Sequence, residues 1–226
     1  MDERLASALR VLPDYLGQHV LLSASALAFG VVLSLPLALV AARRPRWRWP
    51  LLTLASAVQT IPGLALLALF YPLLLALSAL VKPALGLALP ALGFLPALLA
   101  LTLYSMLPIL RNGVAGITGV DPAIREAADG VGMTPRQKLV QVELPLAAPV
   151  IMAGIRLTVL TQISVATVGA FIGAGGLGDI IFQGITQDIG EKVVVGAVVT
   201  SLLAIVCDEL LRRLELHMRS VQAEVA

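Results

Sequence analysis

Long apolar runs separated by short charged segments constrain this chain of 226 residues more than any other feature. An α-helix needs about 20 apolar residues to cross about 30 Å of hydrocarbon. The runs are continuous and rich in leucine and alanine, which favour helix, whereas a membrane β-barrel shows short segments of alternating polarity. Charged residues make up only 13% of the chain, against about 25% in a soluble domain. We therefore expect an all-α membrane protein, a polytopic helical bundle.

The runs predict about five transmembrane helices in a single domain that covers residues 1–226. The second run is long enough for two helices with a turn near VKPALG, and a sixth span stays possible if residues 51–111 contain a re-entrant piece. Residues 1–15 are too polar for the core of a signal peptide and are expected to form a short interfacial helix. The predicted spans are 16–42, 51–79, 90–111, 145–172 and 193–211.

Basic residues predict the orientation, because cytoplasmic loops carry an excess of lysine and arginine. With five spans, eleven basic residues fall on one side and four on the other, and Arg156 lies within the fourth span. We therefore expect a multi-pass membrane protein with the N-terminus outside and the C-terminus in the cytoplasm. The inner residues are Arg43, Arg44, Arg46, Arg48, Arg111, Arg125, Arg136, Lys138, Arg212, Arg213 and Arg219; the outer ones are Arg4, Arg10, Lys82 and Lys192.

Residues 112–144 form a charged loop with two predicted short helices. Asp121 before Pro122 is a helix start, and Gly130 and Gly132 are expected to end that helix after Asp129. Thr134 with Gln137 predicts a capping box at the start of a second helix. That helix is expected to stop near Leu144, because Pro145 follows it.

The first loop helix is expected to present a small apolar face. Ile124, Ala127 and Ala128 fall on one side of it, and Arg125 and Asp129 are spaced for an i, i+4 ion pair. Small side chains allow another surface to approach the backbone closely, and Glu126 adds one charge beside them. The loop therefore has the features of a rigid docking element for a soluble partner.

The loop also carries a family pattern: E-A-A, three residues, Gly, nine residues, Ile, any residue, Leu-Pro. This pattern is typical of binding-protein-dependent ABC import permeases, which the chain resembles from about Leu16 to Leu210; only the isoleucine differs, as Val142. The stretches TIPGLALLAL, VELPLAAPVIMAGIRLTV and AFIGAGGLGDII resemble the osmoprotectant branch, whose substrates include glycine betaine, choline and carnitine. The residues that match the pattern are Glu126, Ala127, Ala128, Gly132, Leu144 and Pro145.

The resemblance implies that these six residues couple the chain to a cytoplasmic ATP-binding subunit. It also implies that the chain lies in the bacterial cytoplasmic (inner) membrane, in contact with membrane lipid. Its further partners would be an extracytoplasmic substrate-binding protein and a second permease, either a copy or a paralogue. ATP and Mg are then expected on the partner ATPase, with no cofactor on this chain. None of the three lysines follows a glycine, so a Walker A phosphate loop is excluded here.

We therefore expect a non-enzymatic permease subunit of an ATP-driven importer for osmoprotectants. The alternatives are a methionine-like amino-acid permease and, from another class, an ion-coupled secondary transporter. The latter usually needs acidic residues inside its spans, and none is expected there. Nucleic acid is disfavoured, because the loop is anchored at both ends in the membrane and carries four acids against three bases.

The substrate path is predicted at a proline within the second span. In QTIPG, Pro62 and the later Pro72 are each expected to kink or break the helix, either for packing alone or to line a path. Gln59, Thr60, Pro62 and Tyr104 are the predicted lining. Arg156 is either a functional residue of the path or a structural arginine.

Three further features receive limited interpretations. GAGGLG matches a dinucleotide fingerprint only formally, because it follows a predicted span and not a strand; Gly173, Gly175, Gly176 and Gly178 are instead expected to form an outer turn or gate. His19 is expected at the membrane interface. No catalytic or metal-ligand set is recognised.

Overall fold

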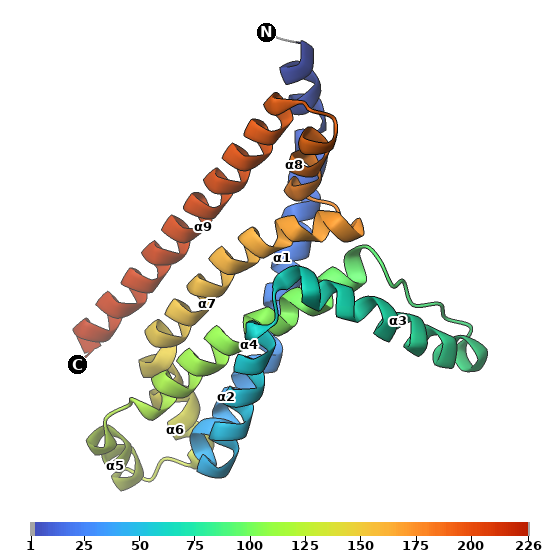
Figure 1. Ribbon diagram of the computed structural model, residues 1–226. Coiled ribbons are helices and arrows are strands. Elements are labelled where there is room, and N and C mark those ends of the chain that lie inside the picture. Colours follow the sequence, from blue (N-terminus) through green and yellow to red (C-terminus); the bar gives the residue numbers. More distant parts are fainter. Residues whose placement is uncertain (1–2, 226) are drawn as a thin grey trace.

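The computed structural model describes residues 3–225, with side chains described for residues 5–218. Met1, Asp2 and Ala226 lie outside the described residues, as do the side chains of Arg4 and Arg219, which count in the charge comparison above. Within this range the chain forms helices and no strand (Figure 1). The elements are α1 (Glu3–Arg43), α2 (Pro45–Thr60), α3 (Gly63–Leu85), α4 (Phe94–Thr118), α5 (Pro122–Gly130), α6 (Pro135–Lys138), the π-helix η1 (Leu139–Glu143), α7 (Leu144–Ala166), the 3-10 helix η2 (Thr167–Ile172), α8 (Leu177–Thr186) and α9 (Gly190–Val225).

Five helical stretches of the described residues are long and apolar enough to cross a membrane, so the predicted all-α bundle of about five spans is confirmed. The N-terminal end of α1 and the C-terminal end of α9 lie at opposite ends of the molecule, and α5 lies near the second of these ends (Figure 1). The stretches are Leu5–Arg43, Gly63–Leu85, Phe94–Thr118, Pro135–Ile172 and Gly190–Met218.

The chain leaves the helical conformation between α2 and α3. Ile61 is extended (φ −75°, ψ 124°), and Pro62 has ψ 142°. Proline disfavours helical geometry in the preceding residue and has no N–H to donate. The break predicted at Pro62 is therefore confirmed, whereas the chain stays helical at Pro72, inside α3. The predicted second span, 51–79, is divided between two helices.

Helix α1 is continuous from Glu3 to Arg43. The separate interfacial helix expected over residues 1–15 does not occur, because the described part of this segment forms the first turns of α1. His19, which was expected at the membrane interface, lies inside the helical bundle. Its side chain is fully buried, and its Nε2 atom lies 3.1 Å from the carbonyl oxygen of Ile163 in α7.

The core lies where α1, α4 and α7 meet, and small residues bring these helices close together. A methyl group on Gly30 of α1 would lie 1.8 Å from the Ser105 hydroxyl oxygen of α4. One on Gly154 of α7 would lie 2.8 Å from the carbonyl oxygen of Pro108. Membrane helices associate largely through such close packing, because lipid tails are as apolar as leucine.

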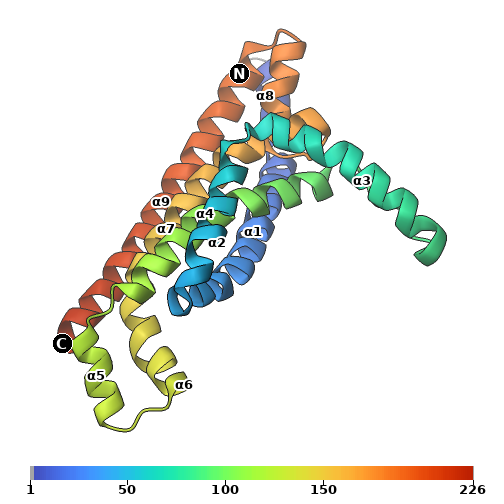
Figure 2. The same cartoon turned by 60° about the horizontal axis from the view of Figure 1, so that its bottom comes forward.

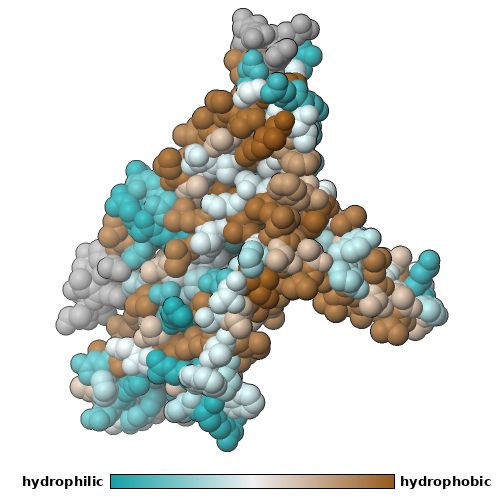
Figure 3. Space-filling view, in the orientation of Figure 1, coloured by the Kyte–Doolittle hydropathy of each residue, from teal (hydrophilic) through white to brown (hydrophobic). Residues whose placement is uncertain are grey.

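Helix α3 projects away from this core as an arm (Figure 2). Its surface is mostly hydrophobic (Figure 3), and Leu80 near its end is 75% exposed. An apolar surface of this extent needs lipid or protein to cover it. The exposed large side chains of α3 are Leu64, Leu69, Tyr71, Leu73, Leu75, Leu77, Leu80 and Leu85.

An ion pair joins α7 to α9. Arg156 donates from Nε to Asp208 Oδ1 at 2.5 Å and from Nη2 to Oδ2 at 2.8 Å, and its Nη1 lies 3.7 Å from Glu215 Oε2. The expectation that the spans contain no acidic residue is therefore wrong, because Asp208 lies within the last membrane-length stretch. Two opposite charges in bidentate contact reduce the cost that either would have alone in lipid.

We expect Asp208→Asn to lower the melting temperature of the purified protein in detergent by about 2–4 °C, because it leaves the Arg156 charge without its bidentate partner. The double variant Arg156→Gln with Asp208→Asn should recover part of the loss, since it removes the Arg156 charge together with its bidentate partner. A double variant that melts below both single variants would contradict the pairing as the cause.

Candidate functional site

The loop between α4 and α7 folds into two short helices with the predicted starts. Asp121 Oδ1 accepts a hydrogen bond from the Ala123 N–H at 2.8 Å, with Pro122 at the first helical position. Thr134 and Gln137 form the predicted capping box: the Thr134 N–H donates to Gln137 Oε1 at 2.9 Å, and the Gln137 N–H donates to Thr134 Oγ1 at 3.3 Å. Both helix starts are thus fixed by local side-chain hydrogen bonds.

The connection between these helices depends on Gly132. Its φ of +78° lies in the left-handed region, which costs an L-residue about 1–2 kcal/mol. The N–H of Met133 donates to the carbonyl oxygen of Ala128 at 3.1 Å and closes the end of α5. No side chain or backbone atom lies within 4 Å of a Cβ built on Gly132, so the backbone conformation, and not space, favours glycine here.

The second helix does not stop at Leu144, which corrects the expectation. It continues through the π-helix η1 into α7, and Pro145 stands in the first turn of α7. The Leu144 N–H donates to the carbonyl oxygen of Leu139, five residues earlier. A π-turn changes the hydrogen-bonding register by one residue, so the chain passes a proline without ending the helix.

The motif residues on α5 differ in their exposure to solvent. Glu126 and Ala127 are exposed, whereas Ala128 is 5% exposed. Ile124 and Val131 expose 43% and 75% of their surfaces. The predicted face of Ile124, Ala127 and Ala128 is therefore only partly correct: Ala128 faces the chain itself, and the surface available to a partner combines Glu126 and Ala127 with two larger apolar side chains.

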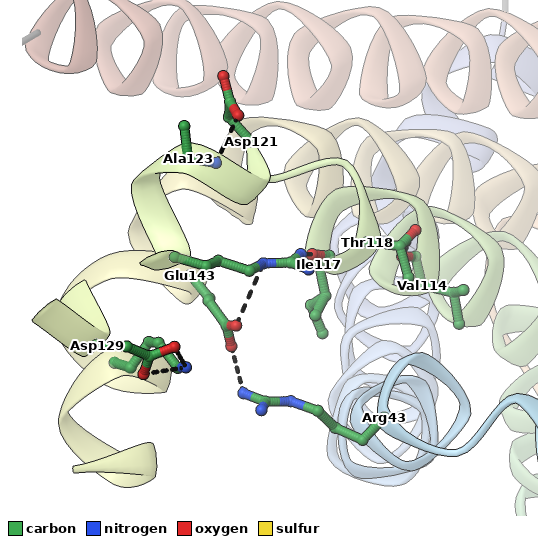
Figure 4. A network of polar contacts seen from close by, with 10 residues as sticks. Arg43, Val114, Ile117, Thr118, Asp121, Ala123, Asp129 and Glu143 are labelled. Carbon is green, nitrogen blue, oxygen red and sulfur yellow. Dashed lines mark hydrogen bonds and ion pairs between the residues drawn. The ribbon is translucent and has the colours of Figure 1, made fainter. Parts of the chain in front are cut away.

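Glu143 is the centre of a charged network that joins this loop to the transmembrane helices (Figure 4). Its side chain is 3% exposed and accepts a hydrogen bond from the Arg43 guanidinium at the end of α1. Arg125 Nε of α5 lies 3.4 Å from Glu143 Oε1, and the Arg125 Nη2 atom donates to the carbonyl oxygen of Ile117 in α4. We call Arg43, Arg125 and Glu143 the Glu143 network.

The ion pair expected between Arg125 and Asp129 is replaced by this network. Asp129 instead accepts hydrogen bonds from Lys138 Nζ at 2.5 and 2.7 Å, which joins α5 to α6. The i, i+4 spacing permits the expected pair, but a buried carboxylate offers Arg125 a stronger partner. The family pattern allows any residue at position 143, and Arg43 lies 100 positions earlier in the chain. In the sequence, the only sign of this role was an acidic residue directly before Leu144 and Pro145.

Four of the predicted path residues lie together at the break between α2 and α3. Gln59 Nε2 donates to the carbonyl oxygen of Tyr104 at 2.8 Å, and the Tyr104 hydroxyl donates to the carbonyl oxygen of Ile61, next to Pro62. Gln59, Thr60 and Pro62 are exposed. The arrangement offers an aromatic ring, an amide and a hydroxyl beside a non-helical backbone. Their role in transport stays a prediction.

Arg156 does not join this group. Its guanidinium is held by Asp208 of α9, as described above, and its hydrogen bonds and ion pairs within the described residues go to α9 and not to the α2–α3 break. Its place in the structure therefore favours the structural interpretation, although a 330 Å³ hollow beside it is lined by Arg156, Asp208, Glu215 and apolar residues.

The glycines after η2 form a tight turn that packs on α1. Gly173, Gly175 and Gly176 have φ values of +72°, +80° and +91°. The Gly176 N–H donates to Gln18 Oε1 at 3.1 Å, and a Cβ on Gly178 would lie 2.1 Å from the carbonyl oxygen of Thr167. The turn follows a 3-10 helix and not a strand, which is unlike a dinucleotide-binding turn. A gating role for these glycines stays a prediction.

Comparison with known proteins places the chain in a family. Residues 30–220 match the family described as "Binding-protein-dependent transport system inner membrane component". The chain is 42% identical over 194 residues to the choline transport system permease protein OpuBB of Bacillus subtilis, covering 86% of this chain and 82% of that protein. It is 39% identical over 198 residues to the osmoprotectant import permease protein OsmW of Salmonella typhimurium, covering 88% of this chain and 87% of that protein.

Solved structures share the fold. The inward-facing MetNI methionine ABC transporter superposes with a TM-score of 0.78 at 21% identity, covering 96% of this chain and 99% of that one. An amino acid ABC transporter with histidines superposes with a TM-score of 0.73 at 22% identity, covering 94% of this chain and 96% of that one. At these identities the likeness extends to the fold alone. The sequence match over residues 30–220 and the five membrane-length helices show that this multi-pass membrane protein belongs to the binding-protein-dependent transport system inner membrane component family.

Proposed function

We propose that the chain is the permease subunit of an ATP-driven importer for osmoprotectants of the choline, carnitine and glycine betaine type. The observation that carries the proposal is a capped, exposed helix, α5, held at the end of a membrane bundle in a chain of this family. Relatives about 40% identical over most of the chain are named for transport of choline, carnitine and glycine betaine. The solved methionine transporter supports only the fold, so the methionine-like alternative has weaker support.

The loop is the proposed docking element for a cytoplasmic ATP-binding subunit. Glu126, Ala127, Ile124 and Val131 of the loop are exposed, and small and apolar side chains around one charge suit a groove on a soluble protein. ATP and Mg would be bound by that subunit, with this chain having no part in hydrolysis. A docked α5 would lie in the cytoplasm. The start of α1 lies at the end of the molecule opposite α5, and the end of α9 lies near α5 (Figure 1), which supports an N-terminus outside and a C-terminus inside.

The substrate path is proposed at the α2–α3 break, between this chain and a second permease. Arm α3 leaves an apolar surface uncovered beside Gln59, Thr60, Pro62 and Tyr104, and a second permease, copy or paralogue, would cover it. An external binding protein would deliver substrate at the end that carries the Gly173–Gly178 turn. Aromatic faces attract quaternary ammonium groups, which suits Tyr104 to cations of the proposed substrate class.

A rigid-body movement would connect these parts. Closure of the ATPase on ATP would displace α5, and the bundle would alternate between two arrangements that open the path to either side. The ion-coupled alternative predicts uptake that follows an ion gradient. Asp208, an acidic residue in the membrane-length part of α9 that such coupling could use, is bound to Arg156 in the structure.

Proteoliposomes that contain this chain, its ATP-binding subunit and its binding protein should accumulate choline, carnitine or glycine betaine only when ATP is supplied. Substrate uptake is measured with radiolabelled ligands, and a non-hydrolysable ATP analogue is the control. Uptake that proceeds equally without ATP, or that requires an ion gradient, would contradict the proposal of an ATP-driven importer. Uptake of methionine alone would keep the importer and replace its substrate.

We expect Gly132→Asp and Glu126→Arg each to reduce recovery of the ATP-binding subunit in pull-downs about tenfold. The first places a side chain in left-handed backbone, at a cost of about 1–2 kcal/mol, and the second reverses the exposed charge on α5; about 1.4 kcal/mol corresponds to a factor of ten. Gly130→Ala is the matched control, because that glycine has open space and no positive φ. Full recovery with both variants would argue against docking through α5.

A further inference from the structure

We propose that Glu143 is a positioning residue that makes the docking loop and the transmembrane helices move as one body. The proposal rests on the function proposed above and adds to it the route by which force leaves α5. The Glu143 carboxylate contacts guanidinium groups from α1 and α5, and Arg125 also reaches α4. The Glu143 side chain, at the end of η1 and directly before α7, therefore connects α1 and α5 to α7, and Arg125 extends the connection to α4.

The packing of the loop explains why these polar contacts matter. The hydrophobic clusters of the described residues include Ile117, Ala147 and Ile151 near the loop, but no residue of α5, α6 or η1. Helix α5 packs mainly against α6 and η1, and these belong to the same loop. Helix α5 thus has few apolar contacts with the bundle. The ion pairs and hydrogen bonds of the Glu143 network supply much of its attachment to the bundle.

The environment of Glu143 favours a fixed geometry. Its side chain is 3% exposed, whereas Arg43 and Arg125 expose 40% and 30%. A buried carboxylate costs free energy unless it is paired, so it stays where two guanidinium groups reach it. Arg43 has access to solvent, whereas the Arg125 Nε atom that faces Glu143 is buried and makes no hydrogen bond. Glu143 is the member of the network that both arginines share. Glu143 is therefore the residue whose charge decides whether the network exists.

The π-helix gives the network a mechanical role. Glu143 is the last residue of η1, between the loop and α7. A π-turn within an α-helix is a local irregularity in hydrogen bonding, and such turns often occur at functional sites. Without a clamp, displacement of α5 and α6 would be taken up by bending at η1. With the carboxylate bound to Arg43 and Arg125, the same displacement moves α1 and α7.

Neutralising the carboxylate should separate ATP hydrolysis from transport. Glu143→Gln keeps the size of the side chain and leaves Glu126, Ala127 and Gly132 unchanged. We expect the ATP-binding subunit to be retained in pull-downs, while the number of substrate molecules taken up per ATP hydrolysed falls about tenfold. Arg43→Gln should act in the same direction, and Arg43→Lys, which keeps the charge, should restore part of the ratio.

Glu209→Gln is the matched control. Glu209 also accepts hydrogen bonds from two arginines, Arg212 and Arg213, but all three lie on α9, so the same loss of charge cannot separate two elements. Its ratio of uptake to hydrolysis should equal that of the unmodified chain. A normal ratio in Glu143→Gln would overturn the proposal, and so would loss of the ATP-binding subunit from that variant, because the carboxylate would then serve docking.

A second measurement does not depend on transport. Spin labels are placed on Ala127→Cys of α5 and Val40→Cys of α1, both exposed positions. Cys207→Ser removes the single native cysteine of the chain. The labels report the distance between loop and bundle in the permease without its ATPase. We expect a narrow distribution that becomes broad with Glu143→Gln and stays narrow with Glu209→Gln. An unchanged distribution in Glu143→Gln would overturn the proposal. If ATP-driven uptake fails with the unmodified chain, the proposed function falls, and this measurement still decides whether the network holds α5.

Discussion

A backbone N–H or C=O group inside hydrocarbon has no water to bind, and this constraint shapes the whole molecule. The membrane-length segments satisfy it as helices, and at two departures from helix a side chain replaces the lost partner. At the α2–α3 break, the Tyr104 hydroxyl donates to the freed carbonyl oxygen of Ile61. At the glycine turn, Gln18 accepts from the N–H of Gly176. Both predicted functional places, the path and the gate, are therefore places where side chains support an irregular backbone.

The helical bundle and the loop are held together by different kinds of interaction. The bundle of α1, α4 and α7 is held by close contact between small residues such as Gly30 and Gly154, which changes little with charge or salt. The loop with α5 and α6 is held by ion pairs and capping hydrogen bonds, centred on Glu143 and on Asp129. Ion pairs that are partly exposed weaken as salt rises. The bundle keeps its shape, and the loop is the part whose attachment depends on a few charges.

Local signals made much of this predictable. The apolar runs indicated five spans, Asp121 and Thr134 indicated the helix starts, and Pro62 indicated the break, because each feature acts on its immediate neighbours along the chain. The same local reasoning failed at Pro145, since a π-turn depends on how η1 and α7 are joined. It also failed where partners are distant in sequence: Arg43 with Glu143, Arg156 with Asp208, and His19 with Ile163. Those pairings require the helices to be placed in space first.

Helix α1 touches both irregular ends of the molecule. Gln18 and His19 lie against the glycine turn at one end, and Arg43 binds Glu143 at the other. The 25 helical steps from Gln18 to Arg43 span about 37 Å. Within this stretch, Pro36 lacks the hydrogen bond to the preceding turn. The first helix is thus a strut that joins the loop end of the molecule to the end with the glycine turn. On the proposed mechanism, a shift of the loop would reach the far turn along this strut, so the two mouths of the proposed path would need no signal through the substrate itself to open in alternation.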